Sequence, residues 1–251
     1  MISVINKAMD IVELLALQSD RPVVLGDIAR ALGLNLATCA NIIKTLVHRG
    51  MVEQVAPRKG YVLGPAVHYL ARSGPYRRDL ALPAEPAVVR LARELRETAM
   101  LVTLRGGQRF VLCESQGQQE LRVNWQVAAD DVFRTATGRL LAAHLPEDEL
   151  QTLLERVGMP EEGWAEVRTA AQLAAALDTI RQEGCVLLYR GEVTAVAYPV
   201  RQEGRVVAAL GIYMPQFRFA PRAQSVLTAV ARTASEIESA IINARTTSQV
   251  R

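Results

Sequence analysis

Cysteine is scarce in this sequence, and its three copies, Cys39, Cys113 and Cys185, are far apart with no CxxC pair. This pattern excludes a disulfide framework and is typical of a reducing compartment, so we expect a cytoplasmic protein. Long apolar runs are missing as well, since no stretch approaches the roughly 18 residues that a membrane span needs. We therefore expect no membrane partner.

The short motifs that mark common enzyme classes are also absent. There is no GxSxG, HExxH, phosphate loop or GxGxxG, and the three histidines, His48, His68 and His144, have no Cys, Asp or Glu at ligand spacing. We therefore expect no enzyme, no metal and no cofactor. The alternative is an enzyme that acts on a small metabolite through its C-terminal domain, with the N-terminal helices as a protein-interaction module. Turnover of a ligand would distinguish an enzyme from a sensor, which returns its ligand unchanged.

Charge of one sign is concentrated at the N-terminus. Residues 1–75 contain eight Lys/Arg and five Asp/Glu, and all the lysines of the chain lie among them. In the remainder, the numbers of basic and acidic residues are equal. A partner that carries negative charge is therefore expected at this end. The rest of the composition is that of a folded protein, because half of the residues are hydrophobic.

Residues 1–64 show the pattern of three short helices and a hairpin. The third helix is expected to begin behind Asn35, a good cap, and to end at Gly50. Two strand-like runs follow, joined by the tip Ala56–Gly60. Two helices, a tight turn and a cationic hairpin predict a winged helix-turn-helix, whose third helix fits a major groove about 12 Å wide.

The side chains expected to contact DNA lie on the polar side of the third helix and at the hairpin tip. Small or hydrogen-bonding residues of the helix can approach base edges, and the cations of the tip can reach flanking phosphates. The predicted DNA-binding residues are Ala37, Thr38, Asn41, Lys44, Thr45, His48, Arg58 and Lys59. The alternative is a three-helix protein-binding module with a solvated polar face.

The sequence resembles the IclR-type transcriptional regulators of bacteria. The resemblance is carried by LGDIARALGL (25–34), TLVHRGMVE (45–53), YVLGPAVHYLA (61–71), RTATGRLLAAHLPEDEL (134–150) and VAYPVRQEGRVVAALGIYMP (196–215). It implies an α+β protein with a winged helix domain (1–64), a linker helix and hinge (65–85) and an effector-binding domain of GAF-like fold (86–251). It also implies a homodimer or tetramer on a duplex DNA operator. The direction of regulation depends on where the operator lies; we expect a repressor rather than an activator. The third helix departs from the family pattern at Leu36, Ala37 and Ala40, so the operator sequence does not carry over.

The second domain is expected to be an antiparallel sheet flanked by helices. We predict a long helix at about Pro86–Thr98, a hairpin across Arg105–Gln108 and a strand at Leu121–Val127. Further helices are predicted at Ala136–Ala143, Pro146–Val157, Ala170–Glu183 and Pro221–Ala244, and further strands at Cys185–Tyr189, Thr194–Val200 and Arg205–Met214.

The resemblance places the effector between this sheet and the loop-to-helix turn at Thr135–Gly138. The predicted effector-binding residues are Trp125, Thr135, Ala136, Thr137, Gly138, Leu188, Tyr189, Arg190, Ala195, Gly211 and Tyr213. Family members that sense small hydrophilic acids commonly carry acidic residues where this chain has residues 188–190. They also commonly carry serines on the strand where this chain has Gly211 and Tyr213. We therefore expect an effector with an aromatic or apolar body lying over Gly211, and a polar head on the amides of the turn. The alternatives are an ordinary helix cap by Thr135 and aromatic residues that only fill the core.

Overall fold

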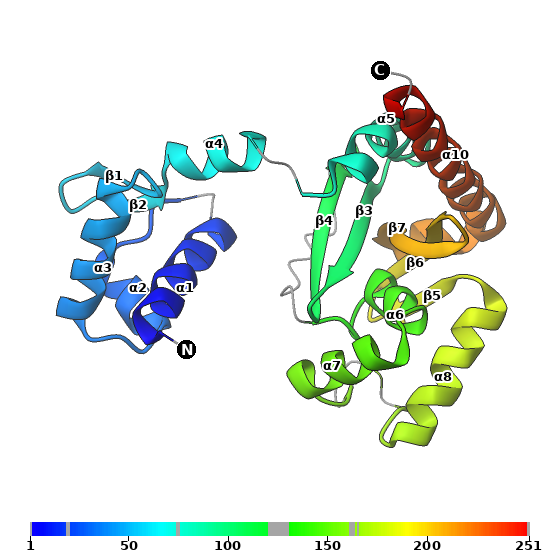
Figure 1. The fold of residues 1–251 in the computed structure, drawn as a ribbon, viewed down its shortest axis with the longest axis horizontal. Helices are drawn as coiled ribbons and strands as arrows, with labels where there is room; N and C mark the ends of the chain where they lie inside the picture. Colours follow the sequence, from blue (N-terminus) through cyan, green and yellow to red (C-terminus); the bar gives the residue numbers. More distant parts are fainter. Residues whose placement is uncertain are drawn as a thin grey trace. The chain divides into compact units, whose positions relative to one another are not determined.

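Two units make up the chain, Met1–Tyr76 and Arg77–Arg251 (Figure 1). The computed structural model describes residues 2–18, 21–73, 76–119, 131–160, 164 and 166–249. The strand expected at Leu121–Val127 and the side chain of Trp125 lie outside these residues. Among the described helices, none is both long and apolar enough to cross a bilayer.

The first unit is three helices and a hairpin, followed by a fourth helix. Its elements are α1 (Ser3–Leu17), α2 (Leu25–Ala31), α3 (Leu36–His48), β1 (Val52–Ala56), β2 (Gly60–Leu63) and α4 (Pro65–Ser73). The helices bury one apolar stripe each, centred on Ile11, Ile28 and Ile43. The backbone of Val23 bonds that of Tyr61 in both directions, at 3.0 and 2.9 Å, which ties the hairpin to the segment before α2. The winged helix-turn-helix expected from the sequence is confirmed.

In the second unit, the described residues form an antiparallel five-stranded sheet in the order β4-β3-β7-β6-β5, with helices packed on it. The strands are β3 (Thr98–Arg105), β4 (Gln108–Ser115), β5 (Val186–Arg190), β6 (Val193–Gln202) and β7 (Arg205–Pro215). The helices are α5 (Arg78–Leu95), α6 (Ala136–Ala143), α7 (Glu147–Val157), α8 (Ala170–Glu183), α9 (Gln216–Phe219), the short η1 (Ala220–Arg222) and α10 (Ala223–Gln249). The predicted hairpin across residues 105–108 is present, and its turn residues Gly106 and Gly107 both have positive φ, as a tight two-residue turn requires.

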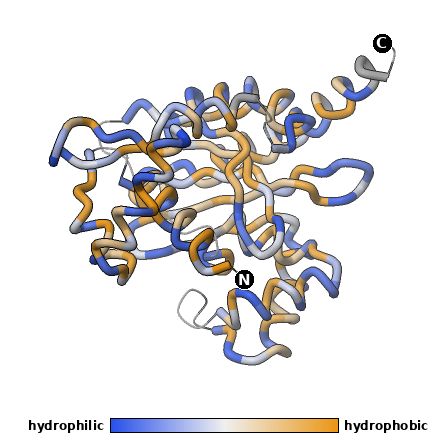
Figure 2. The backbone as a smooth tube through the Cα atoms, turned by 60° about the vertical axis from the view of Figure 1, so that its left-hand side comes forward, coloured by the Kyte–Doolittle hydropathy of each residue, from blue (hydrophilic) through white to orange (hydrophobic). Residues whose placement is uncertain are grey.

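Helices cover both faces of this sheet. One core joins α5 and α10 to the face that includes Leu101 and Leu210. The other joins α6, α7 and α8 to the opposite face, which includes Val102 and Ala209. Figure 2 shows the hydrophobic colouring running along the strands between these layers. The face covered by α6 is called the α6 face below.

The long helix before the sheet starts earlier than predicted. We expected it to begin at Pro86, but α5 begins at Arg78 and contains both Pro83 and Pro86. Each proline removes one backbone hydrogen bond, which is why the sequence favoured a later start. Burial of apolar side chains, among them Leu80 and Ala84, outweighs that loss.

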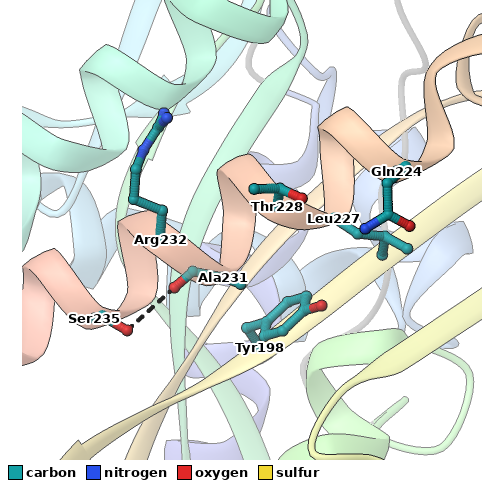
Figure 3. Close-up of a pocket in the computed structure, with 7 residues that line it drawn as sticks. All are labelled: Tyr198, Gln224, Leu227, Thr228, Ala231, Arg232 and Ser235. Carbon is teal, nitrogen blue, oxygen red and sulfur yellow. Dashed lines mark hydrogen bonds between the residues drawn. The ribbon is translucent and has the colours of Figure 1, made fainter.

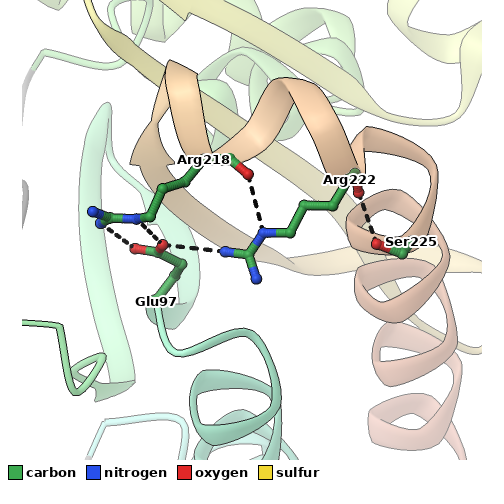
Figure 4. A network of polar contacts seen from close by, with 4 residues as sticks. All are labelled: Glu97, Arg218, Arg222 and Ser225. Atoms are coloured by element: carbon green, nitrogen blue, oxygen red, sulfur yellow. Dashed lines mark hydrogen bonds and ion pairs between the residues drawn. The ribbon is translucent and has the colours of Figure 1, made fainter.

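A buried carboxylate ties the end of α5 to the segment after β7 (Figure 4). Glu97 is 4% exposed and accepts hydrogen bonds from Arg218 Nε and Nη2 at 2.6 and 3.0 Å. Arg222 Nη2 donates to the same carboxylate at 3.2 Å, and its Nε donates to the carbonyl oxygen of Arg218 at 3.1 Å. Two arginines thus share one carboxylate, and α9 and η1 are held against the α5–β3 junction.

Candidate DNA-reading and effector sites

The predicted reading helix α3 has a side-chain N-cap and an exposed polar side. Asn35 is its N-cap, since its side chain accepts a hydrogen bond from the Thr38 amide at 2.7 Å. The side chains of Asn41 and Lys44 are exposed on the face away from the core. The remaining predicted positions of the helix lie on the same outer side; Ala37, Thr45 and His48 are exposed and Thr38 is half-buried. The Thr45 hydroxyl already donates to the Asn41 carbonyl at 3.1 Å, which leaves its oxygen only an acceptor role toward DNA.

The hairpin presents its cations at the tip. Arg58 and Lys59 lie in the turn between β1 and β2, and both are exposed. Arg58 has a left-handed backbone, with φ of 63°. Neither residue has a carboxylate partner among the described ion pairs of this unit, where Arg30 pairs with Asp27. The tip therefore keeps two free positive charges for an anionic partner.

The turn before α6 is held by its own side chains. Thr135 caps the helix, because its hydroxyl oxygen accepts from the Gly138 amide at 3.0 Å and its proton goes to the Val132 carbonyl at 3.2 Å. A Cβ on Gly138 would lie 1.9 Å from that carbonyl oxygen, so only glycine fits. The Gly138 amide is thus used internally, which narrows the expected amide site to Ala136 and Thr137.

The expectation that Gly211 leaves room for a ligand is wrong. A Cβ at Gly211 would lie 2.5 Å from Cγ2 of Thr137, so the methyl group of that threonine already fills the space above the strand. Gly211 serves a different purpose, because it lets the first turn of α6 approach β7 closely. With its methyl group on Gly211, Thr137 accepts a hydrogen bond through its hydroxyl from Arg109 Nη2 at 3.3 Å.

Strand alternation separates the predicted residues of β5. Leu188 packs into the core beneath α6, as does Ala195 on the neighbouring strand β6. Tyr189 is 54% exposed and its ring meets that of Phe219 edge-on at 6.3 Å, in the core of the opposite face. Because neighbouring residues of a strand point to opposite faces, Tyr189 cannot share a site with Leu188. We therefore leave Tyr189 out of the effector site.

Tyr213 lies on the α6 face near the C-terminal end of β7, with Thr98 and Glu114 as polar neighbours. Tyr213 pairs with Thr98 and Ala195 across the sheet. Burial raises the pKa of the Tyr213 hydroxyl, as does the nearby Glu114, while a hydrogen bond with Thr98 lowers it. Burial also raises the pKa of Glu114. A neutral phenol is thus available as a donor or acceptor there.

Arginines collect around α6, and this feature was not recognised in the sequence. Arg139 is 8% exposed; its Nε donates to the Phe133 carbonyl at 2.8 Å, and its guanidinium lies 4.2 Å from the Trp164 ring centroid. Burial lowers the Arg139 pKa to about 10, with Arg190 adding to the shift and Glu166 opposing it. Burial lowers the pKa of Arg109 to about 10 as well, opposed by Asp131. Arg139 and Arg109 therefore both remain protonated at neutral pH. The hairpin register pairs Arg109 with Leu104, and this pairing is the signal that could have placed it on the α6 face.

A hollow of about 440 Å³ lies between β6 and α10, on the side of the sheet opposite to α6 (Figure 3). It is lined by Tyr198, Gln224, Leu227, Thr228, Ala231, Arg232 and Ser235. Its cation is already neutralised, because Arg232 Nη2 lies 2.6 Å from Glu94 and its Nε lies 3.6 Å from Glu236. The hollow is open and lacks a free charged group to orient a ligand, so the α6 face is the stronger candidate.

Burial makes two of the cysteines, Cys113 and Cys39, weakly nucleophilic. Burial raises the pKa of the Cys113 thiol to about 11, with Glu85 adding to the shift, so it is protonated at neutral pH. Burial also raises the pKa of Cys39. In the part of the chain that the structure describes, no three His, Cys, Asp or Glu side chains are grouped to hold a metal ion.

Comparison with known proteins agrees with this arrangement. Residues 4–56 match the model of the IclR helix-turn-helix domain, and residues 76–239 match that of the bacterial transcriptional regulator IclR C-terminal domain. The regulator TtgV of Pseudomonas putida is 34% identical over 52% of this chain and 50% of its own length. The probable regulator ArcR of Halobacterium salinarum is 28% identical over 86% of this chain and 84% of its own.

The same fold occurs in solved structures. An IclR homologue from Microbacterium hydrocarbonoxydans, crystallised with 4-hydroxybenzoate, superposes with a TM-score of 0.76 over 96% of this chain and 99% of its own, at 21% identity. A transcriptional regulator from Rhodococcus superposes with a TM-score of 0.73 over 97% of this chain and 100% of its own, at 23% identity. At these identities the likeness concerns the fold.

Proposed function

This chain belongs to the IclR family of bacterial transcriptional regulators, and we propose from this premise how it binds DNA and its effector. It is a DNA-binding regulator with a helix-turn-helix unit and an effector-binding unit. The relatives compared above are all transcriptional regulators, which favours a sensor over an enzyme. Our proposal concerns the parts that family membership leaves open: the DNA contacts, the assembly, the effector and the direction of regulation.

We assign base reading to α3 and phosphate contact to the hairpin tip. The observation that carries this assignment is the pairing of an outward-facing polar helix side with two free cations on an adjacent hairpin. Asn41 and Lys44 can reach base edges, whereas Arg58 and Lys59 add a sequence-independent attraction. The site of action is the cytoplasm, where the operator is found.

The assembly is a homodimer or a dimer of dimers that holds two reading helices on one operator. The outer side of α1 supports it, because Ile2, Ile5 and Met9 are 66, 55 and 48% exposed in the single chain. These apolar side chains recur three and four residues apart and form one stripe, called the α1 stripe below. A second copy of α1 would cover the stripe, and two-fold symmetry then sets half-sites about 10 bp apart or at a multiple of that distance.

The effector has an aromatic or other apolar body and binds on the α6 face. Leu188, Ala195 and Tyr213 supply apolar area and one hydroxyl there, and Arg190 adds a positive charge. Apolar area removed from water stabilises binding by about 25 cal/mol per Å². Binding of the effector releases the operator, so the regulator is a repressor, and the change passes to the DNA-binding unit through α4.

Operator and effector measurements on the full chain test this proposal. We expect a footprint upstream of its own gene or a neighbouring gene, and a 5–150-fold loss of operator affinity when an effector with an aromatic or apolar body binds, a range typical of coupled sites. Linkage requires that operator DNA weaken effector binding by the same factor. Equal binding to any duplex would refute operator recognition, and an effector affinity that operator DNA leaves unchanged would refute the coupling.

A further inference from the structure

Arg109 stands out among the charged groups of the α6 face because its hydrogen bonds are incomplete. Its Nε is buried and has no hydrogen-bond partner in the described part of the chain, and its bond to Thr137 is long, at 3.3 Å. A guanidinium that leaves water loses strong hydrogen bonds to solvent. Such a loss is normally offset by a carboxylate or by carbonyl oxygens, as the neighbouring arginines illustrate.

Arg139 differs from Arg109 in that its Nε has a hydrogen-bond partner within the protein. Arg139 donates from Nε to a carbonyl oxygen at 2.8 Å and lies over an indole ring. The protein itself therefore holds that cation. The carboxylate of Asp131 raises the pKa of Arg109 through its negative charge. Asp131 forms its ion pair with Arg134, however, at 3.0 Å. Arg134 Nε is also buried without a well-aligned hydrogen bond, but it has this carboxylate beside it. Arg109 has no ion pair among the described residues, so its charge is the less completely satisfied of the two.

Three features direct an anion to this guanidinium. The first turn of α6 begins beside it, and the N-terminal end of a helix dipole attracts negative charge. Arg190 and Arg139 add positive potential on the same face. Thr137 positions the guanidinium, since its methyl group on Gly211 turns its hydroxyl toward Nη2.

We propose that Arg109 binds the carboxylate of the effector, so that this regulator responds to organic acids and rejects their neutral analogues. The proposal rests on the proposed function in one respect, that the α6 face is the effector site. The free Nε and an adjacent Nη form the two-donor fork that matches a carboxylate. Arg109 thereby sets the charge of the effector, while the apolar residues of the same face set the shape of its body.

Matched pairs of acids and amides test the proposal on the full chain by calorimetric titration. Suitable pairs are benzoate and benzamide, hexanoate and hexanamide, and pyruvate and pyruvamide. We expect at least one acid to bind, and to bind roughly tenfold or more tightly than its amide. Arg109→Gln should weaken acid binding roughly ten- to hundredfold and leave amide binding within about twofold. Arg105→Gln, which removes an exposed arginine of the same hairpin, should change neither.

Three results would overturn the proposal: amides that bind as tightly as acids, an acid affinity that Arg109→Gln leaves unchanged, or no acid of the panel bound at all. A structural role for Arg109 is tested separately by the melting temperature of the ligand-free variant. We expect it to equal or exceed that of the parent, because an incompletely bonded buried charge is removed; a clear drop would count against the proposal. Operator binding measured in parallel distinguishes failure of the inference about Arg109 from failure of the proposed function. If the parent binds its operator but shows no acid preference, only the inference about Arg109 fails. Acid binding without operator binding would refute the DNA-binding assignment and leave Arg109 in place.

Discussion

Arg58 holds a backbone conformation that residues other than glycine rarely adopt. Its φ of 63° places it in the left-handed region, which costs roughly 1 kcal/mol for a residue with a Cβ. Glycine would hold this turn without that cost. An arginine in this position is therefore better explained by its charge than by the turn.

Arg58→Gly separates the two roles. We expect the variant to be as stable as the parent or slightly more stable, and to bind every duplex more weakly. The slope of log K against log salt should fall by about 0.9 if one phosphate contact is lost. Fluorescence anisotropy across a salt series on operator and scrambled duplexes measures this, with Arg105→Gln as the control for charge alone. A change in sequence preference at constant salt slope would assign Arg58 to base reading instead.

At the scale of elements, a buried carboxylate holds the junction between α5 and β3 within the second unit. Glu97 comes after Arg96, the C-cap of α5, and precedes Thr98, whose side chain bonds Tyr213 on the α6 face. Its carboxylate also holds Arg218 and Arg222 beyond β7 (Figure 4). The end of α5, the start of the central sheet and α9 thus meet at one carboxylate.

Glu97→Gln should weaken this junction while keeping its shape. An amide offers one acceptor oxygen to two arginines, so their charges lose their counter-ion inside a partly buried site. We expect the free energy of unfolding of the second unit to fall by about 2 kcal/mol, less than for a fully buried pair because Arg222 reaches solvent. Urea unfolding followed by circular dichroism measures it. Glu203→Gln, which removes an exposed partner of Arg245, should cost about 0.5 kcal/mol or less, and equal losses for both variants would contradict the assignment.

The whole molecule depends, in our proposal, on pairing through the α1 stripe. Ile5→Glu combined with Met9→Glu should leave each unit folded, because both side chains are exposed, but should drive the protein toward monomers. Operator affinity should then fall by at least about tenfold, since one reading head gains nothing from the second half-site. Analytical ultracentrifugation and operator titration measure the two effects together. Ile242→Glu on α10, another exposed apolar residue, is the control, and a double variant that sediments as the parent does would exclude this interface.

Local patterns in the sequence determined the elements and their order. The apolar period of α3, the cap Asn35, the glycine pair of the β3–β4 turn and the capped helix α8 that ends before Gly184 each act within a few residues. Such signals are short-range, so a single chain reveals them. They also sufficed for the two-part organisation and for the polar side of α3.

Only the tertiary structure decided which side chains meet. Thr137 fills the space over Gly211, and Arg109 reaches the same threonine from a distant strand. Glu97 meets two arginines that lie far along the chain. The alternation of β5 was visible in the sequence and should have separated Tyr189 from Leu188, but the core that each faces depends on the register of the sheet and on which helix covers it. Contacts of this kind join residues that lie far apart in the chain, and their geometry follows from how helices pack on the sheet rather than from any local period.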